Sequence, residues 1–102
     1  MDWIQTINNT IKLVDSHLKD KYILQLLSKE MYISTSHLQK GFKAITGVTI
    51  SEYFSSRKLY SAALDIVGGV DSFLEISYRY QYESYDAFFK AFKNSMVILL
   101  QK

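Results

Sequence analysis

Four lysines are the residues of this sequence whose types and spacing are typical of binding chemistry. The stretch LQKGFK at residues 38–43 returns as FFKAFK at residues 88–93, and each copy carries two lysines three positions apart. A lysine ammonium group is a compact positive charge that pairs with phosphate. A single lysine is most often an ordinary solvated residue, but repetition at matched positions favours contact with phosphate. These residues are Lys40, Lys43, Lys90 and Lys93.

No set of side chains suited to catalysis or metal binding accompanies these lysines. The sequence has no cysteine, and its two histidines, His17 and His37, are not placed with each other or with carboxylates at the spacing of metal ligands. Zinc sites need three or four such ligands around one ion. We therefore expect that the protein is not an enzyme and that it uses no metal and no cofactor. His37 is interpreted as a helix-surface residue.

The composition indicates a small folded protein in a reducing compartment. Of the 102 residues, 48% are hydrophobic, which is enough to build a core. No apolar run approaches the roughly 20 residues of a membrane span, the first residues lack the pattern of a signal peptide, and no disulfide can form. We expect a cytoplasmic protein with no membrane partner. The net charge of +2 favours an anionic partner only weakly.

Helices are expected throughout the chain. Proline is absent, and the four glycines lie at positions 41, 47, 68 and 69, so little interrupts helices. In the first segment, apolar residues three or four apart share one face of a helix: Ile4, Ile7, Ile11, Val14 and Leu18. We predict an all-α fold of seven helices, six of which these patterns locate. The segments expected to be helical are about 3–18, 23–31, 34–47, 49–66, 72–76 and the residues from 84 onward.

Residues typical of helix N-caps lie at the start of most of these expected helices. Ser, Thr and Asp accept a hydrogen bond from the first turn of a helix, and a Glu or Gln three residues later closes a capping box. We expect caps at Asp2, Ser34, Thr49, Ser72 and Ser84.

One stretch has a period that is typical of a strand. Residues 77–83 alternate between aromatic and polar side chains, as a half-buried strand does. A lone strand has no partner to pair with, so we predict a helix followed by a turn here. Tyr80 and Tyr82 are expected in the core, whereas Tyr78 and Tyr85 are expected on the surface.

The repeated stretch belongs to a larger internal repeat. Leu27-Ser28 matches Ile76-Ser77 at a spacing of 49, whereas LQKGFK matches FFKAFK at a spacing of 50, so the second turn is one residue longer. Each copy is predicted to form a short helix, a tight turn and a longer helix, with Phe42, Phe88 and Phe92 in the core. In this helix-turn-helix plan the second helix can enter the major groove of DNA. The expected parts are an N-terminal subdomain at 1–48, a long connecting helix at 49–67 and a C-terminal subdomain at 68–102.

Two stretches of the sequence carry a resemblance to a known family: HLQKGFKAITGVTISEYFSSRKL and YESYDAFFKAFK. The chain from about residue 7 to residue 93 resembles the DNA-binding domain of AraC/XylS-type bacterial transcription regulators. The resemblance implies a seven-helix unit in which a long helix holds two helix-turn-helix motifs apart, with recognition helices in successive major-groove segments roughly 34 Å apart. It further implies a monomer on double-stranded promoter DNA, an activator that works with RNA polymerase, and a place in the bacterial cytoplasm near the nucleoid.

Position within the resemblance assigns the residues that face DNA. Gln39 can pair with adenine and Lys40 can donate to guanine or phosphate, each good base contact contributing about 1–3 kcal/mol of discrimination. In the second recognition helix, Asp86 is repelled by phosphate and can accept a hydrogen bond from cytosine, and Phe89 offers only apolar contact, for instance to a thymine methyl. The first motif is therefore expected to carry most sequence specificity. The implied DNA-binding residues are Ser36, Gln39, Lys40, Lys43, Arg57, Tyr85, Asp86, Phe89, Lys90 and Lys93.

The sequence departs from the family at its turns and at its end. Where the family usually has glycine, the turns hold Tyr32 and Gln81, so these turns are either reshaped or strained. The ending SMVILLQK replaces the family's usual one and brings four consecutive apolar residues at 97–100. Arg57 and Lys58 either contact the DNA backbone or are solvated. An alternative function therefore stays open: a protein-interaction module of the same fold that has lost sequence-specific DNA recognition and self-associates through residues 96–100.

Overall fold

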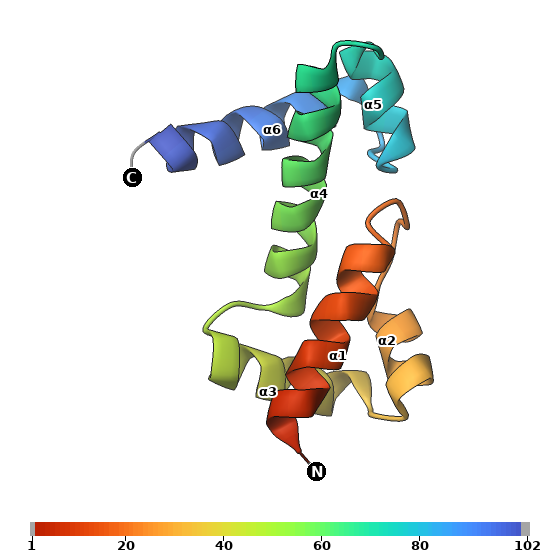
Figure 1. The fold of residues 1–102 in the computed structure, drawn as a ribbon, viewed down its shortest axis with the longest axis vertical. Coiled ribbons are helices and arrows are strands. Elements are labelled where there is room, and N and C mark those ends of the chain that lie inside the picture. The colour runs from red at the N-terminus through yellow and green to blue at the C-terminus, as the bar shows by residue number, and fades with distance from the viewer. Residues whose placement is uncertain (1, 101–102) are drawn as a thin grey trace. The chain divides into compact units, whose positions relative to one another are not determined.

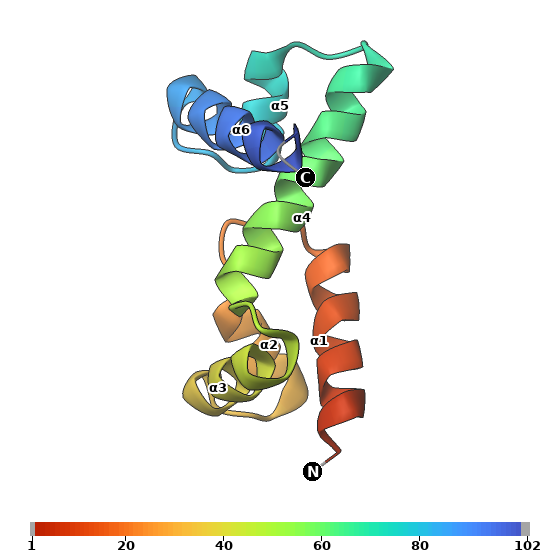
Figure 2. The ribbon, with the colours of Figure 1, turned by 90° about the vertical axis from the view of Figure 1, so that its left-hand side faces the viewer.

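Six helices make up the described part of the chain (Figure 1 and Figure 2). The computed structural model describes the backbone of residues 2–100 and the side chains of residues 2–95, and no strand occurs among them. The residues form two compact units, one of Met1–Leu18 and Tyr22–Ser55 and the other of Lys19–Lys21 and Ser56–Lys102. The helices are α1 (Trp3–Ser16), α2 (Leu24–Met31), α3 (Thr35–Thr46), α4 (Ile50–Gly68), α5 (Phe73–Arg79) and α6 (Tyr85–Leu100).

The all-α prediction is confirmed, but the seventh helix is not found in residues 2–100. No glycine or proline occurs after Gly69, so nothing interrupts α6, which continues as one helix to Leu100. The alternating stretch forms the end of α5 and a turn, as predicted. Across residues 2–100, no helix combines the length and the apolar character that crossing a membrane requires.

The buried face of α1 agrees with the predicted one except at Ile4, because Ile7 and Val14 are buried and Ile11 packs against the core. Asp2 caps the helix by accepting a hydrogen bond from the backbone N–H of Ile4 at 3.1 Å. Ile4 itself was expected on the buried face, but its side chain is 73% exposed. Thr10 is fully buried, and its hydroxyl donates to the carbonyl of Thr6 at 2.8 Å, which satisfies the polar group inside the core. The buried residues of α1 are Thr6, Ile7, Thr10 and Val14.

The caps predicted for the later helices are also confirmed. Because a cap satisfies backbone donors at the start of a helix, each one fixes where its helix begins. Hydrogen bonds from Thr49 lower the pKa of Glu52, whose carboxylate accepts from the Thr49 backbone at 3.0 Å. The observed caps are Ser34 and Ser84, which accept single backbone hydrogen bonds, and the capping boxes Thr49–Glu52 and Ser72–Glu75.

Each unit has its own core. Phe42 and Phe88 are buried as predicted, and Phe92 is half-buried. Tyr80 is buried and Tyr78 is 62% exposed, both as predicted. In the first unit the core consists of Ile7, Val14, Ile23, Leu27, Leu38, Phe42, Ile50 and Phe54. Among the residues of the second unit whose side chains are described, the buried apolar ones are Leu59, Ala62, Ile76, Tyr80 and Phe88.

Each of the two helix-turn-helix motifs has one strained residue in its turn. Tyr32 has φ of 56° and Gln81 has φ of 64°, so both adopt the left-handed conformation that glycine adopts freely. The sequence left open whether these turns are reshaped or strained. The positive φ angles show that they keep the glycine-like conformation and are strained. A left-handed conformation disfavours a residue with a Cβ atom by roughly 1–2 kcal/mol.

Removing this strain is expected to stabilise the first unit. Tyr32 is 95% exposed, so Tyr32→Gly removes almost no packing. The relief of strain is partly offset by the greater freedom of glycine in the unfolded chain, and we expect the free energy of unfolding to rise by about 0.5–1 kcal/mol. Urea unfolding followed by far-UV circular dichroism measures it. Tyr78→Gly, in the last turn of α5, is the matched control and should lower stability by about 0.5 kcal/mol. A loss of that size for Tyr32→Gly would contradict the strain.

Candidate nucleic-acid interface

The first helix-turn-helix motif consists of α2, a turn and α3. Leu38 and Phe42 are 0% and 1% exposed and attach α3 to the core of the first unit. The hydroxyl of Ser28, in α2, donates to the carbonyl of Ile33 at 2.5 Å and thereby holds the turn. The predicted residues Ser36, Gln39, Lys40 and Lys43 are all exposed on α3.

Helix α1 also fixes the place of α3. The indole ring of Trp3 lies against Gly41, where a Cβ atom would come within 2.0 Å of Trp3 Cη2. The same ring lies 5.2 Å from the imidazole ring of His37. His37 is exposed on the helix surface, as predicted, and its ring also contacts Trp3. The glycine inside LQKGFK therefore serves the packing of α1 on α3.

Lys43 has a structural contact of its own. Its ammonium group donates to the carbonyl of Gly47 at 3.0 Å, just beyond the end of α3. A cation at the C-terminus of a helix is favoured by the helix dipole. Because an ammonium group has three donors, this contact leaves Lys43 able to bind a phosphate as well.

The second helix-turn-helix motif consists of α5, a turn and α6. Phe88 is fully buried, with ring centroids of Tyr82 and Phe92 at 5.2 and 5.8 Å. Phe88 therefore occupies the place that Leu38 has in the first motif. The predicted residues Tyr85, Asp86, Phe89, Lys90 and Lys93 are exposed on α6.

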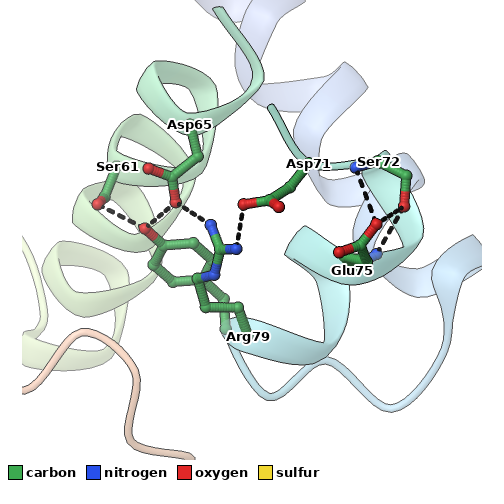
Figure 3. Close-up of polar contacts among 7 residues, drawn as sticks. Ser61, Asp65, Asp71, Ser72, Glu75 and Arg79 are labelled. Carbon is green, nitrogen blue, oxygen red and sulfur yellow. Dashed lines mark hydrogen bonds and ion pairs between the residues drawn. The ribbon is translucent and has the colours of Figure 1, made fainter. Parts of the chain in front are cut away.

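A polar cluster at the end of α5 was not predicted (Figure 3). The Arg79 guanidinium bonds to Asp65 of α4 at 3.1 Å and also to Asp71, and these hydrogen bonds raise the pKa of Arg79. The hydroxyl of Tyr80 donates to Asp65 at 2.7 Å, so Ser61, also at 2.7 Å, donates to Tyr80. The cluster fixes α5 and the start of the turn before α6 within the second unit.

The basic residues of α4 differ from each other. Arg57 is half-buried, and its guanidinium carbon lies 5.3 Å from the ring centroid of Tyr60. Lys58 is 7% exposed, and its ammonium group donates to the carbonyl of Tyr80 at 3.2 Å. Burial lowers the pKa of Lys58, and Asp20 opposes that effect. The prediction that Lys58 is solvated or contacts DNA is wrong, because this lysine connects α4 to the turn after α5 within the second unit.

In the part of the chain whose side chains the structure describes, no group of three or more histidines and carboxylates is placed to hold a metal ion. Residues 96–100, which the alternative function uses for self-association, lie outside the residues whose side chains are described.

Comparison with known proteins identifies the class. The pattern of a family described as "Helix-turn-helix domain" matches residues 27–99, which include both motifs. The chain belongs to the AraC/XylS family of DNA-binding transcription regulators, as the sequence predicted.

The chain is similar to three proteins from Escherichia coli and spans only part of the length of each. The Transposon Tn10 TetD protein is 28% identical over 87 residues, which are 85% of this chain and 63% of that protein. The multiple antibiotic resistance protein MarA of strain K12 is 29% identical over 89 residues, 87% of this chain and 70% of MarA. The right origin-binding protein is 29% identical over 93 residues, 91% of this chain and 32% of that protein.

Proposed function

We propose that this protein binds promoter DNA as a monomer, places α3 and α6 in successive major-groove segments, and activates transcription together with RNA polymerase. One observation carries the proposal: both motifs bury one face of their second helix and expose, at matched positions, a face with two lysines. Lysines on an exposed helix neutralise phosphates, and exposed polar side chains beside them, such as Gln39, can reach base edges. Double-stranded DNA is the partner that the family supports.

The proposal is tested by fluorescence anisotropy with a pool of random duplexes about 25 base pairs long, long enough for two half-sites one turn apart. Salt is varied between about 50 and 200 mM, because release of counterions from DNA makes binding weaken steeply over that range. Steep weakening, together with enrichment of a bipartite site, supports two recognition helices on one duplex. Absence of binding at the lowest salt concentration would contradict the proposal. Transcription of a reporter placed beside the selected site then tests activation.

Lys40→Ala is expected to weaken binding to all duplexes and to reduce the slope of log Kd against log salt concentration by about one. The reason is the loss of one phosphate contact from the exposed face of α3. Lys12→Ala removes the same charge from the exposed surface of α1 and is the matched control. Equal effects of the two substitutions would show that only overall charge matters.

Gln39→Ala is expected to weaken binding to the selected site about tenfold and to relax the preference at a single base pair. Gln39 is exposed on the same face of α3 as Lys40. Selection of duplexes with the variant measures the preference directly. An unchanged selected sequence would remove Gln39 from base recognition.

A protein-interaction module is the second candidate function. Tyr60, Leu64 and Val67 lie three or four residues apart on α4 and are 54%, 56% and 84% exposed. Apolar side chains at this spacing form an exposed stripe of the kind that partner helices cover. Self-association in analytical ultracentrifugation without any DNA binding would favour this candidate over the first.

A further inference from the structure

The exposed face of α6 carries an aromatic pair at its start. Tyr85 and Phe89 are 38% and 42% exposed, and their rings are stacked at 6.0 Å with an interplanar angle of 17°. Phe89 also lies 6.5 Å from the ring of Phe73 at the start of α5. The Phe89 ring therefore contacts aromatic rings on two sides, and these contacts restrict its rotamers before a ligand arrives. Ordered aromatic rings lose little conformational entropy on binding.

We propose that Tyr85 and Phe89 recognise the 5-methyl groups of thymines in the half-site that α6 contacts. The inference rests on the proposed DNA binding and names the bases that one of its two helices selects. Among the groups that base pairs present in the major groove, the thymine methyl is the apolar one, and it is matched by apolar side chains. The two rings are four residues apart on one helix and form a continuous surface, which suits methyl groups on neighbouring base pairs.

The same positions of α3 have different chemistry. At the repeat spacing of 50, Tyr85 and Phe89 correspond to Thr35 and Gln39, which are polar. The two recognition helices thus present different groups to the bases. We therefore assign hydrogen-bond recognition to α3 and methyl recognition to α6, so the two half-sites differ in sequence.

The charges on α6 favour a duplex as the occupant of this surface. Lys90 and Lys93 are exposed on the same helix and complement phosphates. Asp86, next to Tyr85, is repelled by phosphates, which favours the start of α6 facing bases while the lysines face the backbone. A protein partner with an apolar surface has no such need for flanking lysines.

Deoxyuridine tests the inference without changing the protein, because uracil differs from thymine only in lacking the methyl group. In the tightest duplex recovered from the random pool, each thymine is replaced singly and Kd is measured by anisotropy. We expect binding to weaken about fourfold at one or two neighbouring positions, as the loss of one buried methyl predicts. Phe89→Ala should abolish the difference between thymine and uracil at those positions and keep it elsewhere.

Leu74→Ala is the matched control, because Leu74 is apolar and 45% exposed on α5 but lies outside the aromatic pair. It should leave the difference between thymine and uracil unchanged. If the unaltered protein binds thymine and uracil duplexes equally at every position, or selects a half-site without thymine, the inference is overturned and the proposed DNA binding stands. If no duplex binds at the lowest salt, both are overturned and the aromatic pair is left as a surface for a protein partner.

Discussion

Phe88→Ala is expected to lower the free energy of unfolding by about 3–5 kcal/mol, the usual loss for removing a buried phenyl ring. Phe88 is fully buried and packs on Tyr82 and Phe92, so the substitution leaves a cavity in the core of the second unit. A loss of this size is a large part of the total stability of a small protein. Urea unfolding followed by far-UV circular dichroism measures it.

The neighbouring residue provides the control for this prediction. Phe89→Ala removes the same ring from the next position of α6, but Phe89 is 42% exposed. We expect a loss of roughly 1 kcal/mol, from the contacts with Tyr85 and Phe73. Similar losses for the two variants would mean that Phe88 is not the residue that attaches α6 to the core.

Gly41→Ala is expected to destabilise the first unit by about 1–2 kcal/mol, although the same change inside an ordinary helix stabilises by about 1 kcal/mol. The added Cβ atom would lie 2.0 Å from Trp3 Cη2, so the indole ring must leave its place on α3. The apolar area that the ring loses outweighs the gain in helix propensity. Trp3 is the single tryptophan of the chain, and a red shift of its fluorescence would report the displacement.

Two further variants test this explanation by the sign of the effect. In a Trp3→Ala background the obstacle is gone, and Gly41→Ala should raise the free energy of unfolding by about 1 kcal/mol. Gly68→Ala, whose Cβ atom would meet no atom within 4 Å, should cause no loss. If Gly41→Ala stabilises the unaltered protein as much as it stabilises Trp3→Ala, Trp3 does not pack on Gly41.

Features with a local cause were predictable from the sequence. The caps at Ser34, Thr49, Ser72 and Ser84 were correctly predicted, because a cap depends on residues within one helical turn. The uninterrupted α6 also has a local cause, the absence of glycine and proline, although the family resemblance implied a further helix.

The predicted binding residues were assigned by position within the family resemblance, and the structure shows how far each of them is exposed. Nine of them are exposed and Arg57 is half-buried. Their contacts with DNA stay predictions that the binding experiments decide. The exposed side chain of Ile4 shows what periodicity cannot predict. Apolar residues three or four apart lie on one face of a helix, but their spacing does not say which of them another helix covers.

The sequence by itself determined the class of this protein: an internal repeat of two helix-turn-helix motifs, with matched lysines and a family that binds DNA. The tertiary structure alone decided three other features. It placed Trp3 on Gly41, buried Lys58 against the Tyr80 carbonyl, and joined Arg79 to Asp65 and Asp71. These contacts join residues that are 8 to 38 positions apart without a repeating period, so their energies depend on how the helices pack and leave no pattern along the chain.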